Sequence, residues 1–193
     1  MARIVLLVPV LCLFYASLYA QKPVVLIVYH SETGNTQQMA EAVAAGAAGA
    51  DVEEVLLRTT ETVTHQELIQ ADAIIVGSPV YNANVSPEIS RFIASWPFEG
   101  EPLRDKIGAA FVTGGGISAG EELVQMSILQ SMLVFGMIVA GGPDWTQPFG
   151  ASAITSEAPF QAAAGSGLQD RFLAKGQALG ERIALLAIRM ASE

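Results

Sequence analysis

The fold can be read from the stretch VVLIVYHSETGNT, residues 24–36, which joins an apolar run to a loop of hydroxyl-bearing residues and a glycine. An uninterrupted apolar run of this length indicates a strand that is buried on both faces of a parallel sheet. The alanine-rich segment 36–49 follows at once and predicts a helix. Such a unit leaves backbone N–H groups free at the helix N-terminus, where they can bind an anion. The loop is therefore a candidate phosphate site; the alternative is an ordinary Ser/Thr-rich helix cap.

The rest of the chain repeats this alternation of strand and helix. Short apolar runs predict strands at 24–29, 52–57, 73–77, 107–113 and 137–140, and helical patterns predict helices at 36–49, 64–70, 87–96, 121–135 and 168–190. The alternation predicts an α/β fold with a doubly wound, five-stranded parallel sheet in the order 2-1-3-4-5 and helices on both faces. Ligands of such sheets bind beyond the carboxyl ends of the strands. The segment 141–167 has no clear period, so we expect a functional or a disordered loop there.

Composition and charge exclude several classes of protein. The 193 residues suit one domain, and the net charge of −9 without a cluster of lysine or arginine argues against a nucleic-acid binder. A bound anion would accordingly be held by backbone N–H groups rather than by basic side chains. The sequence contains no set of ligands spaced for a metal ion and no Ser–His–Asp combination. We therefore predict no metal site and no catalytic side chain.

Residues 1–20 differ from the rest of the chain. Arg3 precedes an apolar run at residues 4–15, and the small residue Ala20 ends the segment. This pattern predicts a secretory signal peptide and hence an exported protein, periplasmic or secreted. An uncleaved N-terminal membrane anchor and a buried extra strand or helix are the alternatives. With a signal peptide or an anchor, residues 21–193 form the folded domain.

Two further loops follow the third and fourth predicted strands, and in this topology they converge with the first loop. The second loop reads GSPVYNANVS, residues 77–86. Its Tyr81 either stacks on a flat ligand or is a surface tyrosine beside a helix start. The third loop reads TGGGISAGEE, residues 113–122, and its glycines suit a close approach of the backbone to a flat polar ligand. The alternative for the third loop is a flexible connector.

The first two loops resemble those of the flavodoxin family. SETGNTQQMAE, residues 31–41, is similar to that family's phosphate-binding loop and first helix, and the second loop resembles its G-[ST]-P-x-[YR] segment. The resemblance implies a flavodoxin-like fold with bound flavin mononucleotide (FMN), the first loop holding the phosphate and the other two bordering the ring. Glu32 would contribute its backbone only, with its side chain pointing to solvent. The implied FMN-binding residues are Ser31, Glu32, Thr33, Gly34, Asn35, Thr36, Pro79, Val80, Tyr81, Asn82, Asn84, Thr113, Gly114, Gly115, Gly116, Ile117 and Gly120.

The third loop resembles the tryptophan-repressor-binding-protein (WrbA) type of NAD(P)H:quinone reductases. The similarity extends to Glu122, to the Gly136-Met137 pair and to the PFGA motif at residues 148–151. It implies an FMN-dependent NAD(P)H dehydrogenase (quinone), with NAD(P)H as electron donor. The alternatives are a flavodoxin-type electron carrier, whose acidic surface would meet basic redox proteins, and a binding module that has lost its flavin. Expected partners are a quinone or a redox protein, a nearby membrane if the protein is anchored, and further copies of the chain.

The chain also departs from that type, and the departures put both the quinone pocket and the retention of FMN in question. Phe135 replaces a histidine near the flavin, Leu129 replaces a tryptophan, and Asn82 replaces an aromatic residue. One interpretation is that Trp145 or Phe149 supplies a new aromatic wall; the other is that Trp145 packs the long loop.

The chain has only two histidines. His30 adjoins the phosphate loop, where it either adds positive charge when protonated or has a structural role. We expect His65 to be a solvated helix residue.

Overall fold

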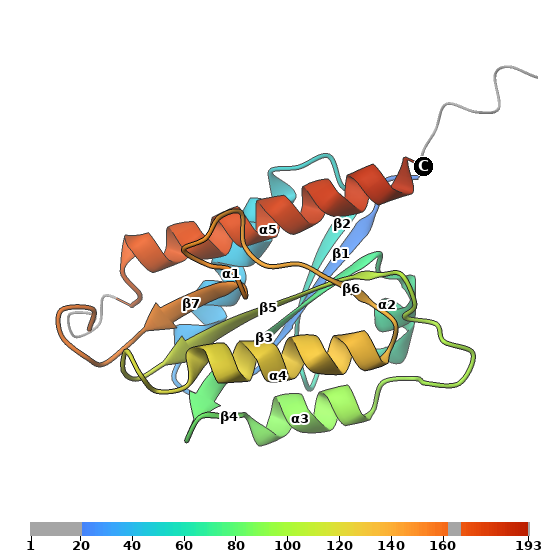
Figure 1. Ribbon diagram of the computed structural model, residues 1–193. Coiled ribbons are helices and arrows are strands. Elements are labelled where there is room, and N and C mark those ends of the chain that lie inside the picture. The colour runs from blue at the N-terminus through green and yellow to red at the C-terminus, as the bar shows by residue number, and fades with distance from the viewer. Residues whose placement is uncertain (1–20, 162–166, 193) are drawn as a thin grey trace, which may run out of the picture.

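The computed structural model describes residues 21–161 and 167–192, which form a parallel sheet between two layers of helices (Figure 1). The long strands are β1 (Val24–Tyr29), β2 (Glu54–Thr59), β3 (Ala73–Tyr81) and β5 (Ile107–Gly114). They are joined in the order β2-β1-β3-β5, and the short β6 (Ile138–Val139) completes the row. Neighbouring strands of this row all run parallel. The predicted fold class and sheet order are thus confirmed.

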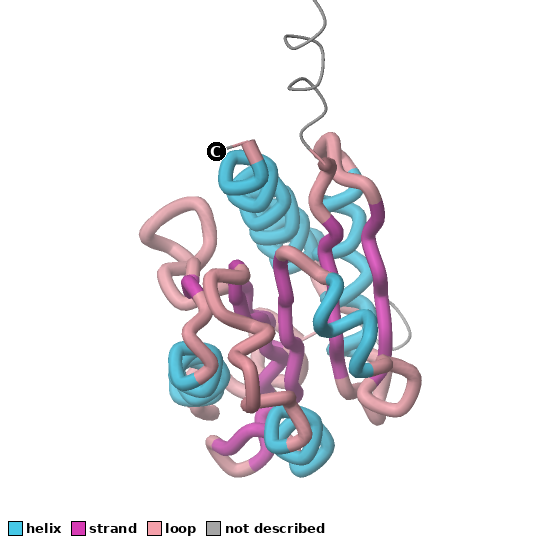
Figure 2. Tube along the Cα trace, turned by 90° about the vertical axis from the view of Figure 1, so that its right-hand side faces the viewer, coloured by secondary structure: helices cyan, strands magenta, loops and turns pink. Residues whose placement is uncertain are grey.

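Helices cover both faces of the sheet (Figure 2). One face packs against α1 (Asn35–Ala48) and α5 (Asp170–Ala191), the other against α2 (His65–Gln70), α3 (Pro87–Ala94) and α4 (Glu121–Val134). The side chains of β1 alternate between these two cores: Ile27 lies in the core with α1 and α5, and Val28 in the core with α3 and α4. Because β1 is buried on both faces, both sets of its side chains are apolar.

Glycines let α1 and α5 pack closely. A Cβ atom added at Gly46 would lie 1.9 Å from the carbonyl oxygen of Gln177, and one added at Gly180 would lie 1.9 Å from that of Val43. Only a residue without a side chain permits such an approach of two backbones. This packing fixes α1, and with it the loop at its N-terminus, against the sheet.

The fifth position of the sheet differs from the prediction. The sequence predicts one strand at 137–140, but two strands share this position: β6 pairs with Ile107–Gly108, and β7 (Ala151–Ile154) pairs with Phe111–Gly114. The chain leaves the sheet between them, and there the Gly142 N–H donates to the carbonyl oxygen of Gln147 at 2.9 Å. The expectation of one loop over 141–167 is therefore wrong. β7 is hard to recognise in the sequence because it is short and half alanine, a residue with weak strand propensity.

The predicted signal peptide or anchor lies in residues 1–20, outside the described residues, and stays a prediction. Residues 162–166 of the predicted long loop also lie outside them. Within residues 21–161 and 167–192, no helix combines the length and the apolar character that crossing a bilayer requires.

Candidate functional site

The ends of β1, β3 and β5 bring the three predicted loops to one edge of the sheet. Tyr29, the last residue of β1, pairs with Gly77 in β3, and Pro79 in β3 pairs with Thr113 in β5. The hydroxyl oxygens of Thr36 and Thr113 lie 2.8 Å apart, and both residues are buried. This hydrogen bond joins the start of α1 to the end of β5, so the phosphate loop and the glycine-rich loop are held together.

The first loop leaves the N-terminus of α1 open. Gly34 precedes the helix with a φ of 86°, and no side chain caps the helix. The first N–H groups of a helix have no partner within it and carry the positive end of the helix dipole. The Gly34 N–H donates to Ser31 Oγ at 3.1 Å, and the side-chain amide of Asn35 donates to Thr33 Oγ1 at 3.2 Å. Since both hydroxyl oxygens act as acceptors, their own protons can be donated to an anion.

Glu32 is compatible with an anion in this loop. Its side chain is 65% exposed, as the sequence predicts, and its Oε1 lies 3.9 Å from Nε2 of His30. The carboxylate is thus hydrated and faces a histidine.

The second loop is shorter than the sequence predicts, because β3 continues to Tyr81 and turns into β4 (Asn84–Val85). Antiparallel pairing joins Tyr81 to Asn84, which leaves Asn82 and Ala83 as the turn. Both turn residues have left-handed backbones, with φ of 52° and 60°. A two-residue hairpin turn requires this conformation, and asparagine adopts it more readily than most residues. The predicted end of the strand at residue 77 is therefore wrong, and a hairpin stands where a loop over 77–86 was expected, although its residues do lie at the predicted edge.

Two of the predicted contacts in this hairpin are restricted by packing. The side chain of Val80 packs against the core between the sheet and α3 and α4, so only its backbone can face a ligand. Tyr81 lies at the end of β3, where burial and then the charges of Glu32 and Glu88 raise the pKa of its hydroxyl. Tyr81 therefore stays a neutral hydrogen-bond donor at physiological pH.

The third loop is held by a segment that the sequence analysis missed. The N–H groups of Thr155 and Ser156 donate to the carbonyl oxygens of Gly114 and Gly115, at 2.9 and 3.1 Å. The Ile117 N–H donates to Glu157 Oε2 at 2.7 Å. A flexible connector would lack such contacts, so the loop is anchored from the side of β7. No sequence signal marks these residues, because their role depends on β7 lying beside β5.

The second and third loops also touch each other. A Cβ atom added at Gly120, where φ is 105°, would lie 2.5 Å from the Cβ of Ala83. The side chain of Glu121, the first residue of α4, is buried below the loop, and its Oε2 accepts from the Gly120 N–H at 3.1 Å. Gly120 therefore serves to pack the two loops together.

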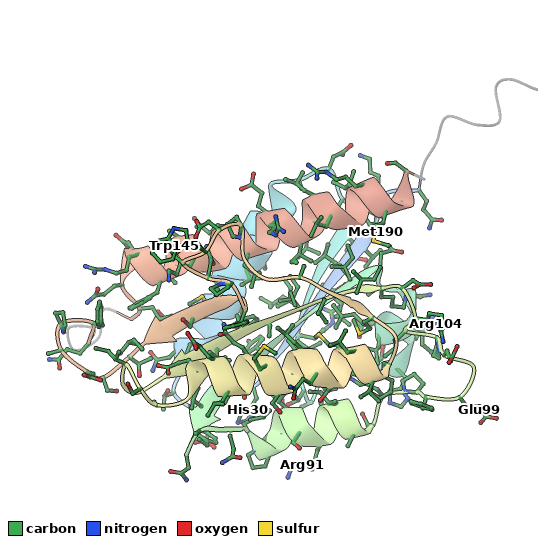
Figure 3. The ribbon with its side chains drawn as sticks, in the orientation of Figure 1. His30, Arg91, Glu99, Arg104, Trp145 and Met190 are labelled. Atoms are coloured by element: carbon green, nitrogen blue, oxygen red, sulfur yellow. The ribbon has the colours of Figure 1, made fainter. Side chains whose placement is uncertain are left out.

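The aromatic wall proposed from the sequence is not present among the loops. Trp145 is 87% exposed and lies beside α5 (Figure 3). The carbonyl oxygen of the next residue, Thr146, accepts a hydrogen bond of 3.0 Å from Nζ of Lys175 on α5. Phe149 packs against the core that contains α4. Neither alternative holds for Trp145, since it neither lines the site nor packs its own loop.

Besides Asn82, two residues depart from the reductase pattern, Leu129 and Phe135, and both lie away from the three loops. Leu129 is buried in the core beneath α4. Phe135 follows the C-terminus of α4, where its ring lies 5.2 Å from that of Trp96 and 5.6 Å from that of Phe98. Both residues are therefore explained by packing.

The arrangement fits the shape and charge of FMN. Among the described residues, a Cβ atom at Gly34 or Gly115 would meet nothing within 4 Å, so both glycines border space at the edge of the sheet that the described chain does not fill. The open N-terminus of α1 suits the phosphate, and the backbone of the second and third loops suits a flat polar ring. Within the described part of the chain, no group of three or more histidine, cysteine or carboxylate side chains is placed to hold a metal ion.

A separate groove of about 390 Å³ lies beside the first loop, between the segment after β2 and α3. Its lining includes Glu61, His65, Glu88 and Arg91. It is outside the three loops, and His65 is exposed there, as the sequence predicts.

Comparison with known proteins agrees with this geometry. Residues 22–151 match the model of the NADPH-dependent FMN reductase family. An NAD(P)H dehydrogenase (quinone) from Azorhizobium caulinodans is 32% identical over 196 residues, which cover 86% of this chain and 98% of that protein. A flavodoxin from Aquifex aeolicus is 38% identical over 126 residues, which cover 63% of this chain and 66% of that protein.

A solved structure supports the fold. The flavodoxin-like, WrbA-like protein from Agrobacterium tumefaciens superposes with a TM-score of 0.70 at 22% identity, over 86% of this chain and 98% of that one. The family match spans well over half of the chain, and the match to the Azorhizobium protein spans most of it. The chain therefore belongs to the NADPH-dependent FMN reductase family and is an FMN-binding oxidoreductase with a flavodoxin-like fold.

Proposed function

We propose that this chain is an FMN-dependent NAD(P)H dehydrogenase that passes two electrons to a quinone. One observation carries the proposal: the open N-terminus of α1, the β3–β4 hairpin and the glycine-rich loop lie at the same edge of the sheet. The Thr36–Thr113 hydrogen bond of 2.8 Å joins the start of α1 to the strand that leads into the glycine-rich loop. When bound at this site, FMN would supply the redox chemistry, which is transfer of two electrons from a nicotinamide to an acceptor. Similarity to the quinone dehydrogenase from Azorhizobium caulinodans supports the choice of acceptor.

The residues of the chain bind and orient the cofactor in this proposal. The N–H groups at the start of α1 and the hydroxyls of Ser31 and Thr33 would hold the phosphate, which would compensate for the lack of a basic side chain in the loop. The backbones of Pro79, Tyr81 and Gly115 would border the ring. The Tyr81 hydroxyl, whose pKa is raised by burial and by nearby carboxylates, would stay neutral. No side chain is required to act as an acid or base.

A second candidate is an electron carrier of the flavodoxin type. It is favoured by the acidic surface next to the first loop, where Glu32 and Glu61 are 65% and 64% exposed. Such a surface attracts basic redox proteins. The absence of an aromatic side chain in the described third loop argues for the enzyme, because carriers stack aromatic residues on the ring.

Anaerobic reduction separates the two candidates. The protein is loaded with FMN, mixed with NADH or NADPH, and followed by flavin absorbance before a soluble quinone is added. Bleaching by the nicotinamide and recovery with the quinone support the dehydrogenase. Bleaching by a photochemical reductant alone, with reoxidation by a basic redox protein, would support the carrier. Failure to bind FMN would contradict both.

We further propose that residues 1–20 direct export and are then removed. The Arg3-led apolar segment supports this proposal. The test is a fusion of the full chain to a reporter that is active on one side of the membrane only. Activity confined to the cytoplasmic side would contradict export, and an unshortened, membrane-bound product would favour the anchor.

A further inference from the structure

A charged cluster adjoins the first loop and has no role in the electron transfer described above. His30, the residue before Ser31, has a side chain that is only 14% exposed. Its Nε2 lies 3.4 Å from Glu88 Oε2 and 3.9 Å from Glu32 Oε1, and its Nδ1 lies 3.9 Å from Glu61 Oε1. One imidazole thus faces three carboxylates, which come from the first loop, the segment after β2, and α3.

The carboxylates facing His30 have reason to stay ionised. Hydrogen bonds from neighbouring threonine hydroxyls, that of Thr59 first, lower the pKa of Glu61. The pKa of Glu88 is lowered chiefly by its own backbone N–H, which outweighs the effect of burial, and also by His30 and Arg91. Both side chains therefore carry a negative charge at neutral pH.

The other groups around His30 do not neutralise this charge. Arg91 lies on the same helix as Glu88, binds Glu88 Oε1 at 2.9 Å, and is 71% exposed. Tyr81, on β3, stays neutral because burial and the nearby carboxylates raise the pKa of its hydroxyl. The cluster thus contains three carboxylates, the imidazole of His30 and one largely hydrated guanidinium.

The contact between His30 and Glu88 can accommodate an added proton. His30 Nε2 and Glu88 Oε2 are both shielded from solvent, and neither has a hydrogen-bond partner among the described residues. A neutral imidazole would either place a lone pair against the carboxylate or offer it an uncharged N–H. A protonated ring offers a positive N–H on either nitrogen. A proton added to His30 can therefore be paired with Glu88.

We propose that His30 is a specificity-determining residue that selects FMN over riboflavin by taking up a proton when the phosphate binds in the first loop. The inference rests on the proposed FMN site. A phosphate dianion enters the loop beside Glu32, in a region that already carries the charges of Glu61 and Glu88. An added proton on His30 offsets part of the repulsion, so the phosphate and the proton each favour the binding of the other.

The sign of the pH dependence follows from this linkage. If the bound phosphate favours the imidazolium, FMN binding and proton uptake by His30 favour each other, so the affinity for FMN falls as pH rises. A phosphomonoester loses its second proton near about pH 6, so its charge is nearly constant above about pH 7. Over the window from about pH 7 to about pH 8.5, we expect the dissociation constant of FMN to rise about three- to tenfold. Riboflavin has no phosphate, so its affinity should stay constant.

The experiment uses the full chain, titrated with FMN and with riboflavin across that window and followed by flavin fluorescence. Calorimetry of FMN binding at one pH, in two buffers with different ionisation enthalpies, measures the proton uptake directly. The variant His30→Asn removes the titrating group. His65→Asn is the matched control, because His65 is the other histidine and is exposed on α2. Circular dichroism and thermal unfolding check that both variants are folded.

Three results are expected: a pH-dependent affinity for FMN and not for riboflavin, a net uptake of protons with FMN, and loss of both effects in His30→Asn but not in His65→Asn. The same affinity of the unmodified protein for FMN at all pH values, or a parallel change for riboflavin, would overturn the inference whether or not His30→Asn folds. Either result would leave the FMN site intact. Absence of FMN binding at every pH would instead overturn the proposed function, and this inference with it.

Discussion

The hydroxyl of Thr36, in the first turn of α1, lies 2.8 Å from the hydroxyl of Thr113, near the end of β5. Both residues are buried. The two residues are 77 positions apart in the chain. Their contact ties the helix that would hold the phosphate to the strand that carries the glycine-rich loop. This buried polar pair therefore links the two halves of the cofactor site directly.

Replacing one partner of this pair should cost more than replacing both. Thr36→Val leaves the buried Thr113 hydroxyl without its partner, which we expect to lower the free energy of unfolding by about 1–3 kcal/mol and to weaken FMN binding. The double variant Thr36→Val/Thr113→Val removes both polar groups and should recover part of the stability. Urea unfolding of the FMN-free protein measures this. Strictly additive losses would show that the two hydroxyls do not interact.

Gly34→Val should abolish FMN binding while the fold survives. Gly34 has a φ of 86°, which a β-branched residue adopts only at a cost of about 1–2 kcal/mol, and its side chain would project into the open phosphate site. Gly100→Val is the matched control, because Gly100 has a φ of 77°, equally open surroundings and a position outside the three loops. Fluorescence titration should show a loss of at least about a hundredfold for Gly34→Val only. Equal affinities of the two variants would place the phosphate elsewhere.

Glu157→Ala should loosen the glycine-rich loop. The carboxylate accepts the Ile117 N–H at 2.7 Å, and without it that amide faces solvent. We expect its hydrogen exchange to become about tenfold faster in Glu157→Ala and less so in Glu157→Gln, whose amide oxygen can still accept. Glu99→Ala, on an exposed segment, is the control. Unchanged exchange at Ile117 would mean that the loop is ordered by its other contacts.

Acid should remove a contribution of Glu67 to stability. Burial acts to raise the pKa of Glu67, but hydrogen bonds from Thr64, where the Glu67 carboxylate completes a capping box on α2, and from Arg58 outweigh burial and lower it. Because the folded-state pKa is the lower one, this stability is complete above the ordinary glutamate pKa of about 4.3 and is lost as pH falls through the folded-state value.

Glu67→Gln should therefore be less stable than the unmodified protein by about 1 kcal/mol at neutral pH, and the difference should shrink as pH falls toward about 3. Urea unfolding at a series of pH values measures it, with the exposed Glu53→Gln as control. A difference that stayed constant down to the lowest pH would show that the carboxylate charge contributes nothing.

The sequence by itself determined the class of the fold and the first half of the site. The apolar run of β1 identifies a strand buried on two faces, and the SETGNT loop after it places hydroxyls and a left-handed glycine at a helix start. These are local features, because propensity, periodicity and turn chemistry act over a few residues. The resemblance of the loops to a known family supplied FMN, which no single motif would establish.

The tertiary structure alone decided what meets at the site. The pairing of β7 beside β5 anchors the glycine-rich loop through Glu157, the β3–β4 hairpin replaces an expected loop, and the distant carboxylates of Glu61 and Glu88 converge on His30. Each of these depends on which strands become neighbours and on the direction of individual side chains. Apart from the hairpin, these contacts join residues tens of positions apart, and their energies come from burial and charge in the assembled sheet rather than from any local pattern.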